Sequence, residues 1–263
     1  MHTVDKAWSI TLYPGAPTGT VTSGHVAGFH KLANVLEWCA ELGIRHVSVF
    51  AFAINNFNRS EEEVSALMNL AKDKLKVLSE RSDLVLRYNG RIRVVGNRAL
   101  LSADVLEAIE QAEEKTRENK GITLNVCFPY SSTFEISEAV RSVVKDVENG
   151  RLEVSQIDEK ALESRLQIPG PDLDILVRTS GQIRFSNYML WQSSKMAYIQ
   201  FVDAYWPDFS LMHMLRIILS WQQSSWIISL RKKNMDSHRA PQQTPHTLVS
   251  DDGTCCSEQD ATQ

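Results

Sequence analysis

Residues 46–54 read HVSVFAFAI, and this run decides the class of the fold. Valine, phenylalanine and alanine side chains fall on both faces of the extended chain, which is typical of a strand buried in a parallel sheet. An apolar helical stripe precedes the run over residues 28–42 and ends at Gly43. This succession of helix and buried strand predicts an α/β fold.

The same alternation extends from this run toward the C-terminus. Further strands are expected at residues 91–96, 122–128, 174–179 and 199–202. Helices are expected after Ser60, over residues 102–120, after the strand 122–128, over about residues 155–166, and from about residue 210. The helix after 122–128 is indicated by the apolar residues Ile136, Val140, Val143, Val144 and Val147. Ser60 and Glu63 form an S-x-x-E capping box, which marks the start of the first of these helices. We therefore expect a mostly parallel central sheet flanked by helices.

Composition divides the chain into three zones. Residues 1–22 are rich in glycine, proline and threonine without periodicity, so we expect an irregular segment. Residues 23–229 form the expected α/β domain. Residues 230–263 are polar and bury too little surface to offset the entropy of ordering, so we expect a disordered tail. The tryptophans expected to pack in the core or at an interface are Trp191, Trp206, Trp221 and Trp226.

The 263 residues carry a formal net charge of −4, from 28 Lys and Arg against 32 Asp and Glu. This balance argues against a non-specific nucleic-acid-binding protein, which normally carries a basic excess. The 4 cysteines include no pair at zinc-ligand spacing, and no apolar run is long enough to span a bilayer. The first residues lack the pattern of a secretory signal. We expect a reduced, cytosol-facing soluble protein.

Two polar clusters directly follow strands, at residues 52–59 (FAINNFNR) and 178–186 (RTSGQIRFS). Ligands of open α/β sheets gather beyond the carboxyl ends of strands. The second cluster places two guanidinium groups and three hydroxyls around Gly181, and such donors suit a phosphate or diphosphate. The alternative is a solvated loop whose arginines pair with carboxylates, with Asn55 and Asn56 as turn residues.

Four runs carry a resemblance to a known family: GHVAGFHKLANVLEWCAELGIRHVSVFAF, NNFNRSEEEVSALMNL, LVRTSGQIRFSNYMLWQ and FVDAYWPDF. The chain resembles the cis-prenyltransferases, which include undecaprenyl and dehydrodolichyl diphosphate synthases. The likeness covers about residues 23–222. It implies a sheet and helices enclosing an apolar tunnel. It also implies addition of isopentenyl diphosphate to a farnesyl-type allylic diphosphate, with cis geometry and Mg²⁺ as cofactor.

The resemblance implies roles for particular residues. Asn56 and Arg59 match the family's N-x-x-R near the reacting centre. Arg178, Arg184 and Ser186 would hold the isopentenyl diphosphate. Gly24 and His25 match the GH pair beside the allylic diphosphate. The apolar side chains that would line the tunnel, or simply belong to the core, are Phe52, Val64, Leu67 and Met68.

The allylic and magnesium half departs from the family pattern. The family opens with an M-D-G-N-x-R segment whose Asp holds the metal, whereas the stretch before Gly24 reads TLYPGAPTGTVTS without an acidic residue. We therefore assign no metal ligand. Further departures from family positions are Val21 for Arg, Ala53 and Asn55 within F-S-x-E-N, Gln182 for Glu, and Tyr198 for a metal-binding Glu.

After Trp221 the sequence shows no R-x-G motif, which single-subunit members carry near the C-terminus. In this the chain resembles eukaryotic catalytic subunits, which borrow R-x-G from a partner similar to the Nogo-B receptor; a homodimer is the other arrangement. The resemblance implies a peripheral location on the cytosolic face of the endoplasmic reticulum, supported by the amphipathic segment 210–230. A cytoplasmic location is the alternative.

Two hypotheses follow. The first is a prenyltransferase: a dehydrodolichyl diphosphate synthase subunit whose activity is impaired because its allylic half is incomplete, with an alternative start of the chain as one explanation. The second is a non-catalytic interaction subunit that keeps the fold and binds at most one diphosphate. The intact isopentenyl cluster favours the first hypothesis. Departures inside matched motifs, such as Ala53 and Asn55, favour the second.

Overall fold

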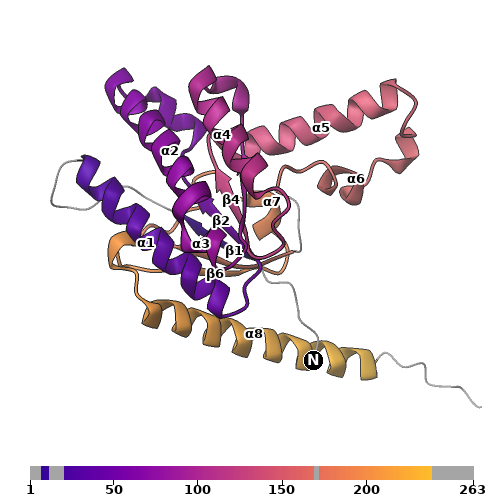
Figure 1. The fold of residues 1–263 in the computed structure, drawn as a ribbon. Coiled ribbons are helices and arrows are strands. Elements are labelled where there is room, and N and C mark those ends of the chain that lie inside the picture. The colour runs from indigo at the N-terminus through magenta and orange to yellow at the C-terminus, as the bar shows by residue number, and fades with distance from the viewer. Residues whose placement is uncertain (1–6, 12–20, 169–171, 239–263) are drawn as a thin grey trace, which may run out of the picture. The chain divides into compact units, whose positions relative to one another are not determined.

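The computed structural model describes residues 7–11, 21–168 and 172–238 (Figure 1). The chain divides into two compact units, residues 1–221 and residues 222–263. A six-stranded parallel sheet forms the centre of the first unit, in the order β3-β4-β2-β1-β5-β6. The strands are β1 (Ala7–Thr11), β2 (His46–Phe50), β3 (Arg91–Val95), β4 (Thr123–Cys127), β5 (Leu173–Arg178) and β6 (Tyr198–Phe201).

Helices flank the sheet. They are α1 (Val21–Glu41), α2 (Glu61–Arg81), α3 (Asp83–Leu86), α4 (Ala103–Thr116), α5 (Ser132–Glu148), α6 (Glu159–Glu163), α7 (Leu190–Ser193) and α8 (Leu211–His238). In Figure 1, α5 and α6 extend from the sheet as an arm. The expected α/β architecture, a parallel sheet flanked by helices, is confirmed. None of the described helices combines the length and apolar character that crossing a membrane requires.

Strand β1 was missed from the sequence. The expected irregular segment 1–22 is wrong at Ala7–Thr11, which form the strand between β2 and β5, and at residue 21, where α1 begins. The run AWSIT has only five residues, too few for a periodicity within a glycine- and proline-rich stretch. Its strand state comes from hydrogen bonding on both sides, so tertiary pairing decides it rather than local propensity.

The C-terminal boundary also differs from the expectation. α8 begins in the first unit and continues through residues 230–238, which we had expected to be disordered. Residues 239–263, the remainder of the expected tail, lie outside the described residues. The helix persists there because the sequence from 222 to 238 contains neither proline nor glycine, so nothing in it breaks the helical backbone.

Two apolar clusters occupy the two faces of the sheet. The larger cluster packs α1, α2 and α4 on one face, with Val35, Leu75 and Ile109 buried against Val47 and Val49 of β2. The smaller cluster lies on the other face. Its buried members are Phe50, Val95, Cys127, Tyr130, Leu173, Leu176, Tyr188 and Met189. Alternate residues of each strand therefore enter different clusters, as the pleat of a strand requires.

The tryptophans divide by environment. Trp206 is 2% exposed, its indole Nε1–H donates to the Gly28 carbonyl at 2.8 Å, and its ring stacks on Phe209. Trp191 and Trp221 are half-buried. Trp226 is 64% exposed, so it does not pack in the core of this chain, and packing at an interface stays a prediction. Trp221 and Trp226 are five residues apart on α8, which places them on different sides of the helix.

We predict that Trp206→Ala lowers the free energy of unfolding by about 3–5 kcal/mol, because a large buried side chain leaves a cavity and an unpaired Gly28 carbonyl. Trp226→Ala is the matched control and should change it by no more than about 0.5 kcal/mol. Urea unfolding followed by circular dichroism measures both values. Equal losses in the two variants would contradict the assignment of Trp206 to the core.

Candidate functional site

The site forms at the carboxyl edge of the sheet. Thr11 of β1 pairs in register with Phe50 of β2 on one side and with Arg178 of β5 on the other. Because these strands are parallel and end level, the loops that follow β2 and β5 leave from the same edge. These loops are the two polar clusters identified in the sequence.

A polar pocket of about 470 Å³ lies between the two loops. Its lining residues are Phe50, Ala51, Phe52, Ala53, Asn55, Asn56, Arg59, Arg184, Ser186 and Asn187. The structure therefore brings the predicted catalytic residues Asn56 and Arg59 together with the predicted diphosphate ligands Arg184 and Ser186. Among the described residues, the lining contains two guanidinium groups and no carboxylate. Such a surface favours an anion.

Neither Arg59 nor Arg184 forms a salt bridge within the described part of the chain. Both residues are exposed at the pocket, and Arg184 donates instead to the neutral amide oxygen of Gln182. The alternative in which loop arginines pair with nearby carboxylates therefore does not describe these two side chains. Their charges remain available to a bound anion.

The environment of Arg178 differs from that of Arg184 and Ser186. It is 1% exposed and does not line the pocket. Its Nη1 donates to the carbonyl of Arg184 and, at 3.0 Å, to the hydroxyl of Ser186. The buried guanidinium thus holds the loop that presents Arg184 and Ser186. Direct contact of Arg178 with the diphosphate, which the family resemblance implies, stays a prediction.

The backbone of the same loop is fixed at both ends. The amides of Ser180 and Gly181 donate to the carbonyls of Ala204 and Val202, at 2.9 and 3.0 Å. Ser186 and the residue after it have left-handed φ angles of 49° and 60°, which turn the chain sharply at the pocket wall. These hydrogen bonds and turns hold the hydroxyl of Ser186 beside Arg178.

Asn187 is a pocket residue that the sequence reading did not single out. Its side chain accepts from the Thr133 amide at 3.0 Å and donates to the Thr133 hydroxyl at 2.6 Å. Its carbonyl accepts from the Ser132 amide at 2.8 Å. Asn187 therefore fastens the β5 loop to the start of α5. The signal was its place directly after Ser186 in the matched RTSG-x-x-R-x-S-N run.

A buried carboxylate supports this junction. Glu135 is 0% exposed and accepts from the Tyr130 hydroxyl, from the amides of Gln167 and Ile168 at 2.9 and 3.1 Å, and from the Gln192 side chain at 3.1 Å. Burial, followed by the charge of Glu135, raises the pKa of Tyr130 well above its usual range. Tyr130 also pairs with Ala53 in the loop after β2. The network therefore ties both loops of the site to α5.

An apolar cavity of about 150 Å³ adjoins the polar pocket and shares Ala51, Phe52 and Asn56 with it. The shared residues are the boundary between a polar and an apolar compartment. The rest of its lining comes mainly from α1, α2 and the sheet: Gly28, Phe29, Leu32, Val49, Leu67, Leu70, Ala71, Lys74, Leu75, Leu78, Val94, Val126, Phe128, Trp206 and Pro207. The expected apolar tunnel stays a prediction, and this cavity is an apolar space beside the polar pocket that could form part of it.

The predicted tunnel residues divide at this cavity. Phe52 and Leu67 line it. Val64 and Met68 are half-buried and do not line it, and Met68 packs against the larger core cluster instead. For Met68 the core alternative therefore describes the structure better, and the tunnel assignment of Val64 stays a prediction.

The structure gives less support for the predicted allylic diphosphate ligands and for a bound metal than for the polar pocket. Gly24 and His25 lie in the first turns of α1, but the surroundings of these two residues are outside what the structure describes. No group of three His, Cys, Asp or Glu in the described part of the chain could hold a metal ion. Tyr198, at the position where the family resemblance suggested a metal-binding Glu, donates to the amide oxygen of Gln200 at 3.2 Å. The described residues do not fit a protein-held Mg²⁺.

Sequence comparison gives consistent results. A family described as putative undecaprenyl diphosphate synthase matches residues 16–226. A dehydrodolichyl diphosphate synthase complex subunit of Schizosaccharomyces pombe is 45% identical over 200 residues, 76% of this chain and 76% of that protein. The corresponding human subunit is 40% identical over 221 residues, 84% of this chain and 66% of that protein.

Solved structures show the same fold. Lavandulyl diphosphate synthase from Lavandula x intermedia, in complex with dimethylallyl diphosphate, superposes with a TM-score of 0.76 at 28% identity, over 82% of this chain and 94% of that one. A probable undecaprenyl diphosphate synthase from Campylobacter jejuni gives a TM-score of 0.70 at 26% identity, over 84% and 96%.

We predict that Glu135→Ala lowers the free energy of unfolding by at least about 3 kcal/mol, because it leaves several buried donors unsatisfied. Glu138→Ala, one turn further along α5, removes a carboxylate whose side chain is 42% exposed and should cost about 0.5 kcal/mol. Urea unfolding compares the two. A Glu135→Ala chain as stable as the Glu138→Ala chain would show that the buried network does not support the site.

Proposed function

This chain belongs to the undecaprenyl and dehydrodolichyl diphosphate synthase family of cis-prenyltransferases, and from that premise we propose that it is a dehydrodolichyl-type subunit with impaired activity on its own. Its reaction class is the cis-prenyl elongation of an allylic diphosphate by isopentenyl diphosphate. The observation that carries this proposal is the polar pocket, which joins Arg59, Arg184 and Ser186 and opens onto an apolar cavity at Asn56.

The polar pocket suits the isopentenyl diphosphate. Arg59 and Arg184 offer rigid forks of N–H donors, and Ser186 and Asn187 add short donors around them. Two guanidinium groups balance part of the charge of a diphosphate. The apolar cavity beyond Asn56 suits the hydrocarbon, which gains free energy by leaving water. Holding both substrates at this boundary lowers the entropic part of the barrier to carbon–carbon bond formation.

Arg178 contributes by holding the binding loop. Its hydrogen bonds reach the backbone of Arg184 and the hydroxyl of Ser186, the two residues proposed to bind the diphosphate. Because both residues are fixed before the ligand arrives, less conformational entropy is lost on binding.

Impairment is proposed from the charge of the site. An allylic diphosphate carries several negative charges, and its ionisation adds charge to the leaving group. The pocket lining holds no carboxylate, and the sequence has no acidic residue between Asp5 and Glu37. The described residues therefore do not hold the ion that would offset this charge, which costs several kcal/mol of transition-state stabilisation. Mg²⁺ remains an expectation from the family resemblance alone.

A non-catalytic role is the second candidate function, and one observation favours it. Ala53 and Asn55, two of the departures from the family pattern, both line the polar pocket. They replace a hydroxyl and a carboxylate inside the site rather than at its periphery. A chain with this pocket would still bind one diphosphate through Arg184 and Ser186, and would serve a complex by keeping the fold.

We propose that the chain works with a partner, either a second copy or a Nogo-B receptor-like subunit that supplies R-x-G. The yeast and human relatives are named as subunits of complexes. The α5 arm offers an apolar face, where Val140 and Val144 are 43% and 49% exposed one helical turn apart. Met196, before the edge strand β6, is 71% exposed. A peripheral location on the endoplasmic reticulum is proposed with this assignment.

We predict that the purified chain, given farnesyl diphosphate, labelled isopentenyl diphosphate and Mg²⁺, makes little long-chain product. Replacing residues 1–22 with a family-type segment that keeps the β1 sequence Ala7–Thr11 and adds M-D-G-N-x-R after it should raise product formation, most of all with a partner subunit added, because it restores the metal-binding carboxylate while the sheet stays complete. Radiolabel incorporation measures both. Robust turnover by the unmodified chain alone would refute the impairment, and an inert chimera would place the cause at Ala53, Asn55 and Gln182.

We also predict that isopentenyl diphosphate binds to the chain with the same affinity in EDTA as in Mg²⁺. Arg184→Gln should weaken binding by about 10–100-fold, the loss expected for a hydrogen bond between charged groups. Arg141→Gln, an exposed arginine on α5, is the control and should bind as the unmodified chain does. Isothermal titration calorimetry measures the dissociation constants. Unchanged binding in Arg184→Gln would remove the polar pocket as the diphosphate site.

A further inference from the structure

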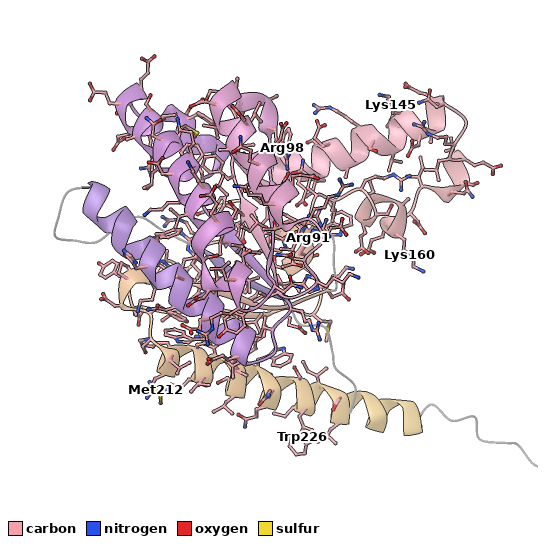
Figure 2. The ribbon with its side chains drawn as sticks, in the orientation of Figure 1. Arg91, Arg98, Lys145, Lys160, Met212 and Trp226 are labelled. Carbon is pink, nitrogen blue, oxygen red and sulfur yellow. The ribbon has the colours of Figure 1, made fainter. Side chains whose placement is uncertain are left out.

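In the second unit, the side chains that the structure describes belong to residues 222–230 of α8. Between residues 222 and 230 no side chain is buried, and Trp226, Ile227, Ile228 and Leu230 are 64%, 38%, 45% and 40% exposed. Figure 2 shows the Trp226 side chain projecting from α8. A helix of this length draws most of its stability from packing an apolar face, and is marginal in water without it. The exposed apolar side chains therefore call for a surface that covers them.

The apolar side chains have a preferred side. Trp226, Ile227 and Leu230 are related by spacings of one, three and four residues, which place them on one side of an α-helix. Serines occupy positions 224, 225 and 229 of the same helix. The side that carries Trp226, Ile227 and Leu230 is thus a short apolar face with a tryptophan in it, bordered by Gln222 and Gln223, while Ile228 lies on the opposite side of the helix. Such a face suits the boundary between headgroups and acyl chains, where tryptophan is enriched.

Charge identifies the partner. Arg231, Lys232 and Lys233 directly follow the apolar group, and the sequence has no acidic residue between Asp208 and Asp236. This local excess of positive charge contrasts with the net charge of −4 of the whole chain. A basic run beside exposed apolar side chains complements an anionic lipid surface, because basic side chains reach the headgroups while the apolar face enters the acyl boundary.

We propose that residues 222–238 of α8 bind the surface of an anionic bilayer, with Trp226, Ile227 and Leu230 entering the interface and the basic run 231–233 contacting acidic headgroups. The segment lies on the membrane and does not cross it. The inference deepens the proposed peripheral location, and it rests on the proposed function only in that a polyprenyl product is itself a membrane lipid. Vesicle binding needs no turnover, so an inactive chain that binds vesicles leaves this inference standing.

The full chain should sediment with vesicles of phosphatidylcholine and phosphatidylserine, and at least tenfold more weakly with phosphatidylcholine alone. Replacing Arg231, Lys232 and Lys233 together by glutamine should weaken binding to the acidic vesicles on the order of 100-fold, from the contribution of each basic residue near the surface. The pair Trp226→Gln and Leu230→Gln should weaken it at least tenfold, because the apolar face is lost.

Matched controls separate the segment from general charge and apolarity. Replacing the exposed Arg117, Lys120 and Lys160 by glutamine removes the same charge from the first unit and should leave binding unchanged. Leu86→Gln does the same for an apolar side chain that is 68% exposed. Circular dichroism confirms that each variant is folded.

Three results would overturn the proposal. The unmodified chain could fail to bind the acidic vesicles, or the controls could weaken binding as much as the α8 variants do. Alternatively, Trp226→Gln with Leu230→Gln could change the oligomeric mass in light scattering while vesicle binding is absent in every variant. That last result would show that a second copy of the chain covers the apolar face.

Discussion

The buried guanidinium of Arg178 is the interaction on which the site depends. It lies at the end of β5, level with the ends of β1 and β2, and reaches back to the carbonyl of Arg184 and the hydroxyl of Ser186. Both contacts come from Nη1, and losing them would remove partners from a charge that is 1% exposed, which is costly. The loop therefore keeps the conformation that presents Arg184 and Ser186 to the polar pocket. The sheet register brings the ends of the strands to one edge, and Arg178 contacts the loop that follows β5 at this edge.

A second consequence of this arrangement is the meeting of two compartments. The loop after β2 carries Asn56 at the boundary between the polar pocket and the apolar cavity. Under the proposed function, the charged end of a prenyl diphosphate and its hydrocarbon would occupy the polar and the apolar compartment on either side of this residue. The Glu135 network and Asn187 hold both loops against α5, so the boundary is built on packed elements. Ala53 and Asn55, which depart from the family pattern, line the polar side of this boundary.

Much of this arrangement could be predicted from the sequence. Buried strands such as 46–54 and the polar residues directly after them indicate a parallel sheet with a ligand edge, and Asn56, Arg59, Arg184 and Ser186 do share one pocket. Strand β1 could not be predicted, because its state depends on pairing with β2 and β5. The burial of Arg178 could not be predicted from the sequence either.

Helical spacing was also insufficient to predict the environments of the side chains on α2. It places Val64, Leu67 and Met68 on one stripe, but only the opposing surfaces decide which of them faces the cavity and which packs in the core. The matched motifs thus identified residues that line the polar pocket, whereas their burial could be read only from the structure. The same distinction separates Arg178 from Arg184, two arginines of one motif with different environments.

A crystal structure of the chain with isopentenyl diphosphate tests the central claim most directly. The account predicts the diphosphate in the polar pocket, with its oxygens about 3 Å from the donors of Arg184 and Ser186 and with Arg178 still bonded to the loop behind them. A diphosphate bound elsewhere, or an Arg178 side chain that has left Ser186 to contact the ligand itself, would contradict it.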